Sequence, residues 1–111
     1  MRDHMLASMR DHLSAINAIQ AALAKADFDK AAEIAESRIG MSSLEAHNAA
    51  HMAPFMPKPM QEFGTNMHHA ASQFARQAQE VAVSGNLKQL IGGLAKITQQ
   101  CVACHAKYRV H

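Results

Sequence analysis

The sequence has few of the residues that build β-sheets. It contains no tryptophan, one tyrosine and four phenylalanines, and aromatic residues make up 5% of its 111 positions. Strands favour β-branched and aromatic residues, so the composition argues against a β-sandwich or a β-barrel. No apolar run is long enough to cross a bilayer. The net charge is only +2, with no Lys/Arg cluster, which gives no basis for nucleic-acid binding. The length predicts one domain over residues 1–111.

The periodicity of apolar residues predicts four helices packed as an antiparallel bundle, an all-α fold. The first helix covers about 1–24, and the second follows an N-cap at Asp27 and ends or kinks at Gly40. Residues 44–50 extend it beyond that irregularity. Three prolines make 51–64 a connection without regular helix. A third helix resumes by Asn66, and the turn 84–86 leads to a last helix over about 87–109.

Each helix has an expected buried stripe. For the first helix the stripe is Leu6, Met9, Leu13, Ile16, Ile19 and Leu23, which leaves His4 and His12 at the surface. The later stripes are Phe28, Ala31, Ala32, Ala35 and Ile39; then Met67, Ala71, Phe74, Ala78 and Val81; and finally Leu87, Leu90, Leu94, Ile97, Cys101 and Tyr108. Gly92 and Gly93 inside the last helix would be explained by a close approach of a neighbouring helix or a cofactor.

The only two cysteines form the pattern Cys101-Val102-Ala103-Cys104-His105. This is the signature for covalent attachment of c-type haem. Each thiol adds to one haem vinyl group, and His105 becomes the proximal ligand of the iron. Two alternatives are a redox disulfide and one half of a zinc site that includes His105. The disulfide pair usually opens a helix after a strand, and a second cysteine pair for zinc is missing.

This C-terminal pattern, extended by Tyr108 and Arg109, resembles the class II c-type cytochromes, the cytochrome c prime family. The first helix agrees, because in that family an Arg precedes by four residues the side chain over the distal haem face, as Arg2 precedes Leu6. The run 52–55 resembles the loop between the second and third helices. The likeness covers nearly the whole chain, although the N-terminus is short.

The resemblance implies one covalent haem c. It assigns the thioethers to Cys101 and Cys104, the iron to His105, and a place near the proximal side to Arg109, for which a solvated helix end is the alternative. Tyr108 is interpreted as a packing residue.

Two residues compete for the distal side of the haem. The register from Arg2 puts Leu6 there, which leaves the iron five-coordinate and open to NO or CO. A helix rotated by about 100° presents Met5 instead, as a sixth ligand of an electron carrier. That rotation would turn His12 inward and Leu13 outward. Burial of Leu13 is worth roughly 2 kcal/mol, so the pattern favours Leu6. Met9 is expected to pack against the haem edge.

Histidine and methionine are concentrated between positions 47 and 69. The residues are His47, His51, Met52, Met56, Met60, Met67, His68 and His69. Thioether and imidazole ligands suit Cu(I), so copper handling is the alternative function. The simpler interpretation is that the methionines fill gaps in the core and the histidines are solvated.

The sequence therefore predicts a haem protein without enzymatic activity. Its partners would be redox proteins, and NO or CO as ligands of the iron. The family forms dimers through its first two helices, which the Ala-rich faces near Ala21 and Ala31 permit. Haem is attached outside the bacterial cytoplasm, so we expect a periplasmic location. The start of the chain has no apolar signal region, which indicates a mature or trimmed form.

Overall fold

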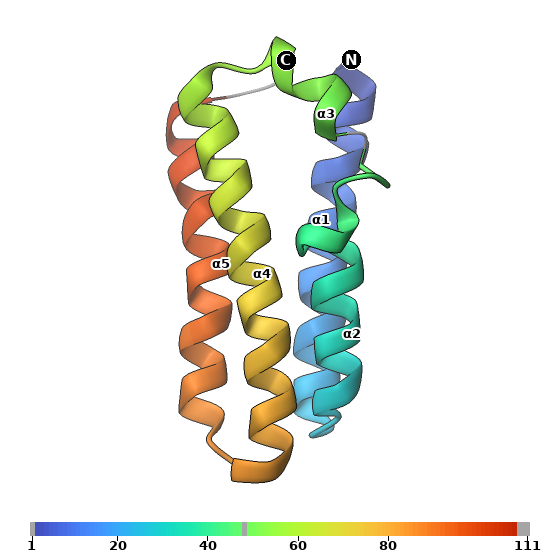
Figure 1. Cartoon of the computed structure of the whole chain (residues 1–111), viewed down its shortest axis with the longest axis vertical. Coiled ribbons are helices and arrows are strands. Elements are labelled where there is room, and N and C mark those ends of the chain that lie inside the picture. The colour runs from blue at the N-terminus through green and yellow to red at the C-terminus, as the bar shows by residue number, and fades with distance from the viewer. Residues whose placement is uncertain (1, 48, 109–111) are drawn as a thin grey trace.

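The computed structural model describes residues 2–47 and 49–108, and this part of the chain is helical without any strand. The long helices are α1 (Arg2–Ala24), α2 (Phe28–Arg38), α4 (Lys58–Ser84) and α5 (Leu87–Lys107). They lie side by side along the long axis of the molecule (Figure 1). Between α2 and α4 the chain forms the 3₁₀ turn η1 (Met41–Ser43), the short helix α3 (Ala49–Met52) and the 3₁₀ turn η2 (Ala53–Phe55). The all-helical bundle predicted from the sequence is confirmed.

Local signals in the sequence set the helix ends as expected. The Asp27 carboxylate accepts a hydrogen bond from the Lys30 amide at 3.1 Å and caps α2. Gly85 ends α4 with φ at +74°, and the Asn86 side chain caps α5 through the Gln89 amide at 3.3 Å. The predicted turn at 84–86 is therefore confirmed.

The connection between α2 and α4 differs from the prediction. The helix α4 begins at Lys58, about eight residues earlier than expected, because Pro59 lies in its first turn, where a missing N–H costs nothing. Residues 44–50 do not continue α2 as one helix, because that helix ends at Arg38 and only the short α3 follows. The Gln61 side chain holds the connection in place by donating to the Ala53 and Met56 carbonyls at 2.8 and 2.9 Å.

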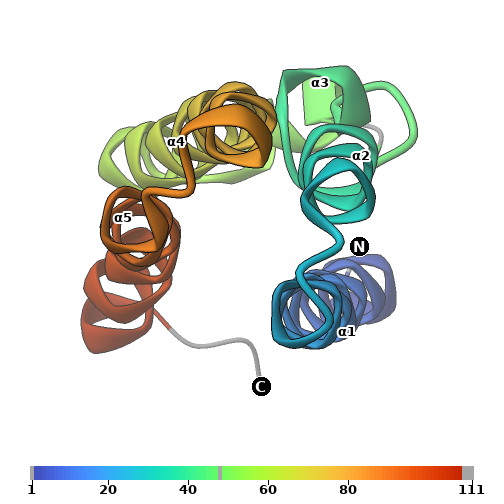
Figure 2. The same ribbon diagram turned by 90° about the horizontal axis from the view of Figure 1, so that it is seen from below.

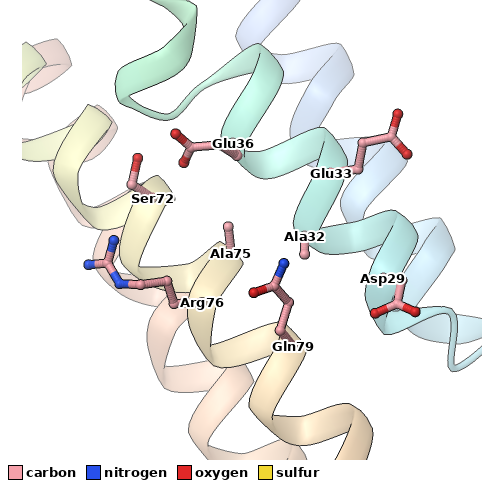
Figure 3. A pocket seen from close by; sticks show the side chains of 8 residues that line it. All are labelled: Asp29, Ala32, Glu33, Glu36, Ser72, Ala75, Arg76 and Gln79. Carbon is pink, nitrogen blue, oxygen red and sulfur yellow. The ribbon is translucent and has the colours of Figure 1, made fainter.

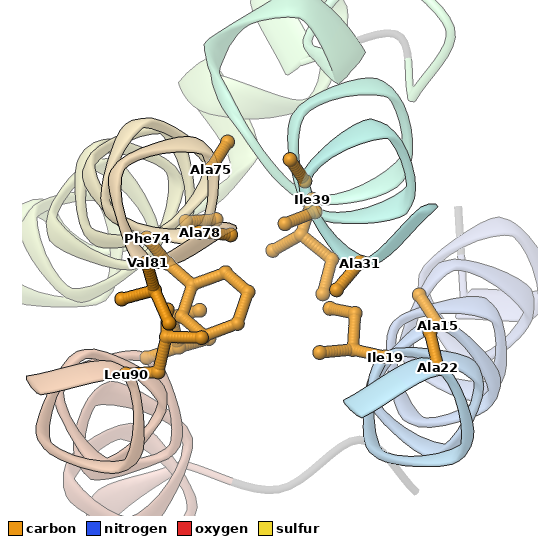
Figure 4. Packing of buried hydrophobic residues seen from close by; sticks show 14 of the residues in the cluster. Ala15, Ile19, Ala22, Ala31, Ile39, Phe74, Ala75, Ala78, Val81 and Leu90 are labelled. Carbon is orange, nitrogen blue, oxygen red and sulfur yellow. The ribbon is translucent and has the colours of Figure 1, made fainter. Parts of the chain in front are cut away.

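The core lies between the four long helices. Figure 4 shows Phe74 of α4 pointing toward Ile19 of α1 and Ile39, just after α2. The predicted stripe of α4 is buried throughout, and the α2 stripe is buried apart from Phe28, which is partly buried. In α5, Leu90 and Ile97 are buried and Leu94 and Cys101 pack partly against the core, but Leu87 is 49% exposed, contrary to the prediction. Leu87 is the first residue of α5, where the helix has only begun to face its neighbours.

The two glycines in α5 have different surroundings. Gly93 is buried, and a Cβ at this position would collide with the side-chain oxygen of Gln77 and lie 3.4 Å from the Phe74 ring. Close approach of α4 therefore explains Gly93. A Cβ at Gly92 would meet nothing within 4 Å, so nothing in the structure explains that glycine.

The stripe predicted for α1 is confirmed at Ile16, Ile19 and Leu23, which pack in or against the core, but it is wrong at Met9 and Leu13. His12, Ala15, Ile19 and Ala22 face the core, whereas Leu13 is 70% exposed and Met9 is 39% exposed. The alanines at 15 and 22 allow α1 to lie close to α2, and His12 finds polar neighbours inside. Ala31 is fully buried, so it cannot belong to an outer face for a dimer, although Ala21 is exposed.

Candidate functional site

The two cysteines and His105 occupy the last turns of α5. Both thiols are half-buried and form no disulfide, and Cys101 packs against the core. The Cys101 Sγ lies 3.8 Å from the Ile97 carbonyl, to which it can donate weakly. His105 is exposed, and the Tyr108 amide closes the helix by donating to the Cys104 carbonyl at 2.9 Å. The motif thus presents two accessible thiols and an unburied imidazole on consecutive turns.

The electrostatics of the thiols differ from those of a redox-active cysteine pair. Burial raises the pKa of Cys101, and burial together with the neighbouring Cys101 raises the pKa of Cys104. Reactive Cys-x-x-Cys pairs have a lowered pKa that supplies a thiolate near neutral pH. Both thiols here are protonated at neutral pH, which argues against the redox-disulfide alternative.

The last turns of α5 stand beside an opening of the bundle. Figure 2 shows α1, α2, α4 and α5 along an arc, with α1 and α5 at its two ends. Over the described residues, α1 packs on α2, α2 on α4 and α4 on α5, whereas α1 and α5 do not pack on each other. The start of α1 and the end of α5 lie at the same end of the molecule (Figure 1). Apolar side chains remain exposed on both of these helices, including Met9 of α1 and Val102 of α5, which is 70% exposed.

The structure places most of the other predicted site residues near that end. Met5 and Leu6 are both half-buried, and Tyr108 is half-buried. Arg2 is exposed and lies 3.8 Å from Asp3, a surface pair of little energetic weight. Arg109 lies outside the described residues, so its predicted place near the haem has no structural counterpart here.

The rotation of α1 bears on the choice between Leu6 and Met5. Leu6 was favoured because the alternative orientation turns His12 inward and Leu13 outward. In the structure only 7% of His12 is exposed, and Leu13 is largely in solvent. His12 can be inside because it is not an isolated buried imidazole, since its Nε2 lies 3.3 Å from the Nδ1 of His47. Burial of Leu13 therefore gives no support to Leu6, and Met5 and Leu6 are both half-buried.

A histidine cluster that the sequence did not predict lies inside the bundle. His12 of α1, His47 of the connection and His68 of α4 have ring centroids 4.7 to 6.4 Å apart. Burial and the charges of the other two rings lower the pKa of His12 to about 4. His12 was expected at the surface, because spacing alone does not show that rings 35 and 56 positions away meet it.

The histidine- and methionine-rich segment divides between inside and outside. Met52 and Met67 are buried, as expected for methionines that fill a core, whereas His51 and His69 are exposed. The His51 ring is 6.0 Å from that of Phe55. Within residues 2–47 and 49–108, no three His, Cys, Asp or Glu side chains form a ready-made metal site. The predicted copper ligands are thus not gathered into one set.

A shallow hollow lies between α2 and α4, away from the opening between α1 and α5 (Figure 3). Glu36 and Ser72 line it, and both help to fix the connection. The Ser42 hydroxyl donates to the Glu36 carboxylate at 2.6 Å, and the Met41 amide donates to the Ser72 hydroxyl at 2.8 Å. Hydrogen bonds with Ser42 and Ser72 lower the pKa of Glu36. The polar side chains that line the hollow therefore anchor the connection to α2 and α4.

Comparison with known proteins gives no match to a family model, to a curated protein or to a solved structure. None of the described helices is long and apolar enough to span a membrane.

Proposed function

We propose that this chain is a haem protein of the class II c-type cytochrome kind, an antiparallel four-helix bundle with one covalent haem c. The observation that carries the proposal is the Cys101-x-x-Cys104-His105 pattern on the last turns of a bundle helix. Cys101 and Cys104 would form the thioethers, and His105 would be the proximal ligand of the iron.

The residues around the motif fit such a group. Both thiols are free and half-buried three positions apart on one helix, and their raised pKa values do not suit disulfide exchange. The opening between α1 and α5, two helices that both carry exposed apolar side chains, suits a large apolar ring. Sites for cofactors are generally concave and mostly apolar, and they occur between the helices of bundles.

The group, when bound, supplies reversible one-electron chemistry and a site for diatomic ligands. The chain contributes ligation, burial and access. We identify no side chain as a catalytic acid, base or nucleophile, so the proposed role is electron transfer with protein redox partners, NO or CO binding, or both. Covalent attachment outside the cytoplasm implies a periplasmic location. The proposed homodimer would use surfaces of the first two helices other than the buried Ala31.

On the distal side, Leu6 and Met5 are the two candidates, and both side chains are half-buried. Met5 would act as a sixth ligand of the iron. A thioether ligand completes the coordination of the iron and raises its reduction potential, which suits electron transfer. Leu6 with an open iron, and therefore gas binding, is the competing arrangement. Met9 and Arg2 would lie on the same side, and Tyr108 and Arg109 near His105.

The visible spectrum of the reduced protein, with and without CO, tests both the attachment of haem and the identity of the distal residue. Sharp α and β bands that CO leaves unchanged mean a sixth protein ligand, and Met5→Leu should then convert the spectrum to the CO-sensitive form. A broad high-spin spectrum that shifts with CO means that Leu6 leaves the iron open. The Cys101→Ser/Cys104→Ser variant is the control for covalent attachment. No haem spectrum from a strain that matures c-type cytochromes would refute the proposal.

Copper handling by the 47–69 segment is the alternative proposal. Titration of the haem-loaded protein with Cu(I) separates it from the other roles, because it requires binding that depends on His51 and on the exposed methionines or histidines of the segment. Absence of such binding leaves the buried methionines with a packing role.

A further inference from the structure

Three elements that are distant in sequence bring three imidazoles together. His12 belongs to α1, His47 to the connection and His68 to α4. The ring centroids of His12 and His47 are 4.7 Å apart, and the His68 centroid is 6.0 Å from the first and 6.4 Å from the second. Three imidazoles on a tetrahedral ion, with metal–nitrogen bonds of about 2.0–2.1 Å, place their centroids about 5 Å apart.

The closest pair already has the spacing of metal ligands. The Nε2 of His12 and the Nδ1 of His47 are 3.3 Å apart. Two nitrogens bound to one tetrahedral ion at about 2.05 Å are separated by about 3.3 Å. A hydrogen bond between the two rings has a similar length, so this distance alone does not distinguish the two arrangements. The surroundings of the other nitrogens of His47 and His68 favour the metal arrangement.

Two of the rings are held from behind, as metal-binding histidines are. The Nδ1 of His68 donates to the Ile39 carbonyl, which leaves its Nε2 as a lone pair. The Nε2 of His47 lies 3.6 Å from the Asp11 carboxylate, which leaves the Nδ1 facing His12. Ligating imidazoles characteristically give their other N–H to a carboxylate or a carbonyl, which fixes the tautomer and the ring orientation.

The third ring, His12, is buried, with only 7% of it exposed. Its Nε2 faces His47 and is the nitrogen that would bind the ion. Its Nδ1, on the other side of the ring, has no hydrogen-bond partner among the described residues and is a position for an ordered water.

One ion pair and one further histidine lie beside the cluster. The Asp11 carboxylate faces it from α1, and Arg38 of α2 holds that carboxylate at 2.6 Å. His4 lies at the rim, with its Nε2 3.0 Å from the His47 carbonyl.

We propose that His12, His47 and His68 bind one divalent transition-metal ion, Zn²⁺ or Cu²⁺, with a fourth position left for water. Imidazole nitrogen suits both ions. The site is not ready-made, because the His68 ring must move by about 1 Å to reach tetrahedral spacing. The proposal uses two histidines of the 47–69 segment but adds His12, and it does not depend on haem.

Metal binding by the full chain, haem-loaded and pretreated with chelator, tests the proposal. After equilibrium dialysis against Zn²⁺ or, separately, Cu²⁺, elemental analysis counts the ions per chain. We expect one ion, and for Cu²⁺ an electron paramagnetic resonance signal with nitrogen hyperfine structure. His47→Gln and His68→Gln should each weaken binding at least about tenfold. Asp11→Asn should weaken it less, because the Asp11 carboxylate is 3.6 Å from the Nε2 of His47, beyond hydrogen-bond distance. His12→Gln is unsuitable as sole evidence because a buried residue is replaced.

The matched controls are His51→Gln and His69→Gln, which change exposed histidines of the same segment. If the three-histidine cluster binds the ion, they retain the affinity of the parent chain, whereas a loss in these two variants alone assigns binding to the exposed part of the 47–69 segment and overturns the proposal. Equal losses in the control and test variants, or full binding by His47→Gln and His68→Gln, would overturn the proposal, as would absence of binding by the parent. Haem content is read separately from absorbance. If no haem is attached, the experiment is repeated in the Cys101→Ser/Cys104→Ser chain, so that thiols do not bind the metal.

Discussion

The orientation of α1 can be tested by removing one exposed and one buried side chain. Leu13 is 70% exposed, so less than a third of its burial is realised in the fold. Full burial of a leucine is worth roughly 2 kcal/mol, so Leu13→Ala should cost about 0.6 kcal/mol. Ile19 is fully buried, and truncation of such a residue costs about 2–5 kcal/mol because a cavity adds to the lost transfer free energy.

The measurement is urea unfolding followed by far-UV circular dichroism, with parent and variants at equal haem content. The free energies of unfolding should fall in the order parent, Leu13→Ala, Ile19→Ala, with at least about 1.5 kcal/mol between the two variants, by the same magnitudes. If the free energy of unfolding depends on urea concentration with the same slope in all three proteins, the variants unfold from the same state as the parent. A loss of about 2 kcal/mol or more in Leu13→Ala, the value for a fully buried leucine, would refute the exposed position of Leu13.

Three further predictions concern stability. Gly92→Ala should raise the free energy of unfolding by up to about 1 kcal/mol, whereas Gly93→Ala should gain less or lose stability, because its methyl group must displace the Gln77 side chain; parallel urea melts compare the two. The pKa of His12 lies below its ordinary value of 6.5, at about 4, so its contribution is complete above pH 6.5 and disappears as the pH falls toward 4. In metal-free buffer, the free energy of unfolding should fall by at most about 3 kcal/mol across that pH range. A free energy of unfolding that does not change with pH would contradict this prediction. Asp11→Asn should cost about 1 kcal/mol at neutral pH, because it removes a half-exposed partner of Arg38. That cost should shrink in urea melts at high salt, and a loss that salt leaves unchanged would point to packing instead.

The sequence predicted most of the fold because the strongest signals are local. Apolar spacing marked the α4 stripe, and Asp27, Gly85 and Asn86 marked the helix ends. The start of α4 was misplaced because a proline in the first turn of a helix was interpreted as a break.

The sequence predicted the motif of the candidate site but not its surroundings. The cysteine spacing can be recognised within a five-residue motif, whereas the face that α1 turns to the core depends on contacts across the bundle. Small alanines at 15 and 22 outweighed the larger Leu13, because they permit closer packing. The burial of His12 depends on His47 and His68, and no periodicity within one helix reports such partners.

The arc of helices also has a consequence for how the chain folds. The pairs α1–α2 and α4–α5 are joined by short turns, so each can form as a hairpin from neighbouring residues. Over the described residues, the α2–α4 seam is the main contact between the two hairpins, and it bridges the connection 39–57 rather than the whole chain. Folding rates rise when contacts are local in sequence. We therefore expect rapid folding by the docking of two hairpins, without any step that must bring the first and last helices together.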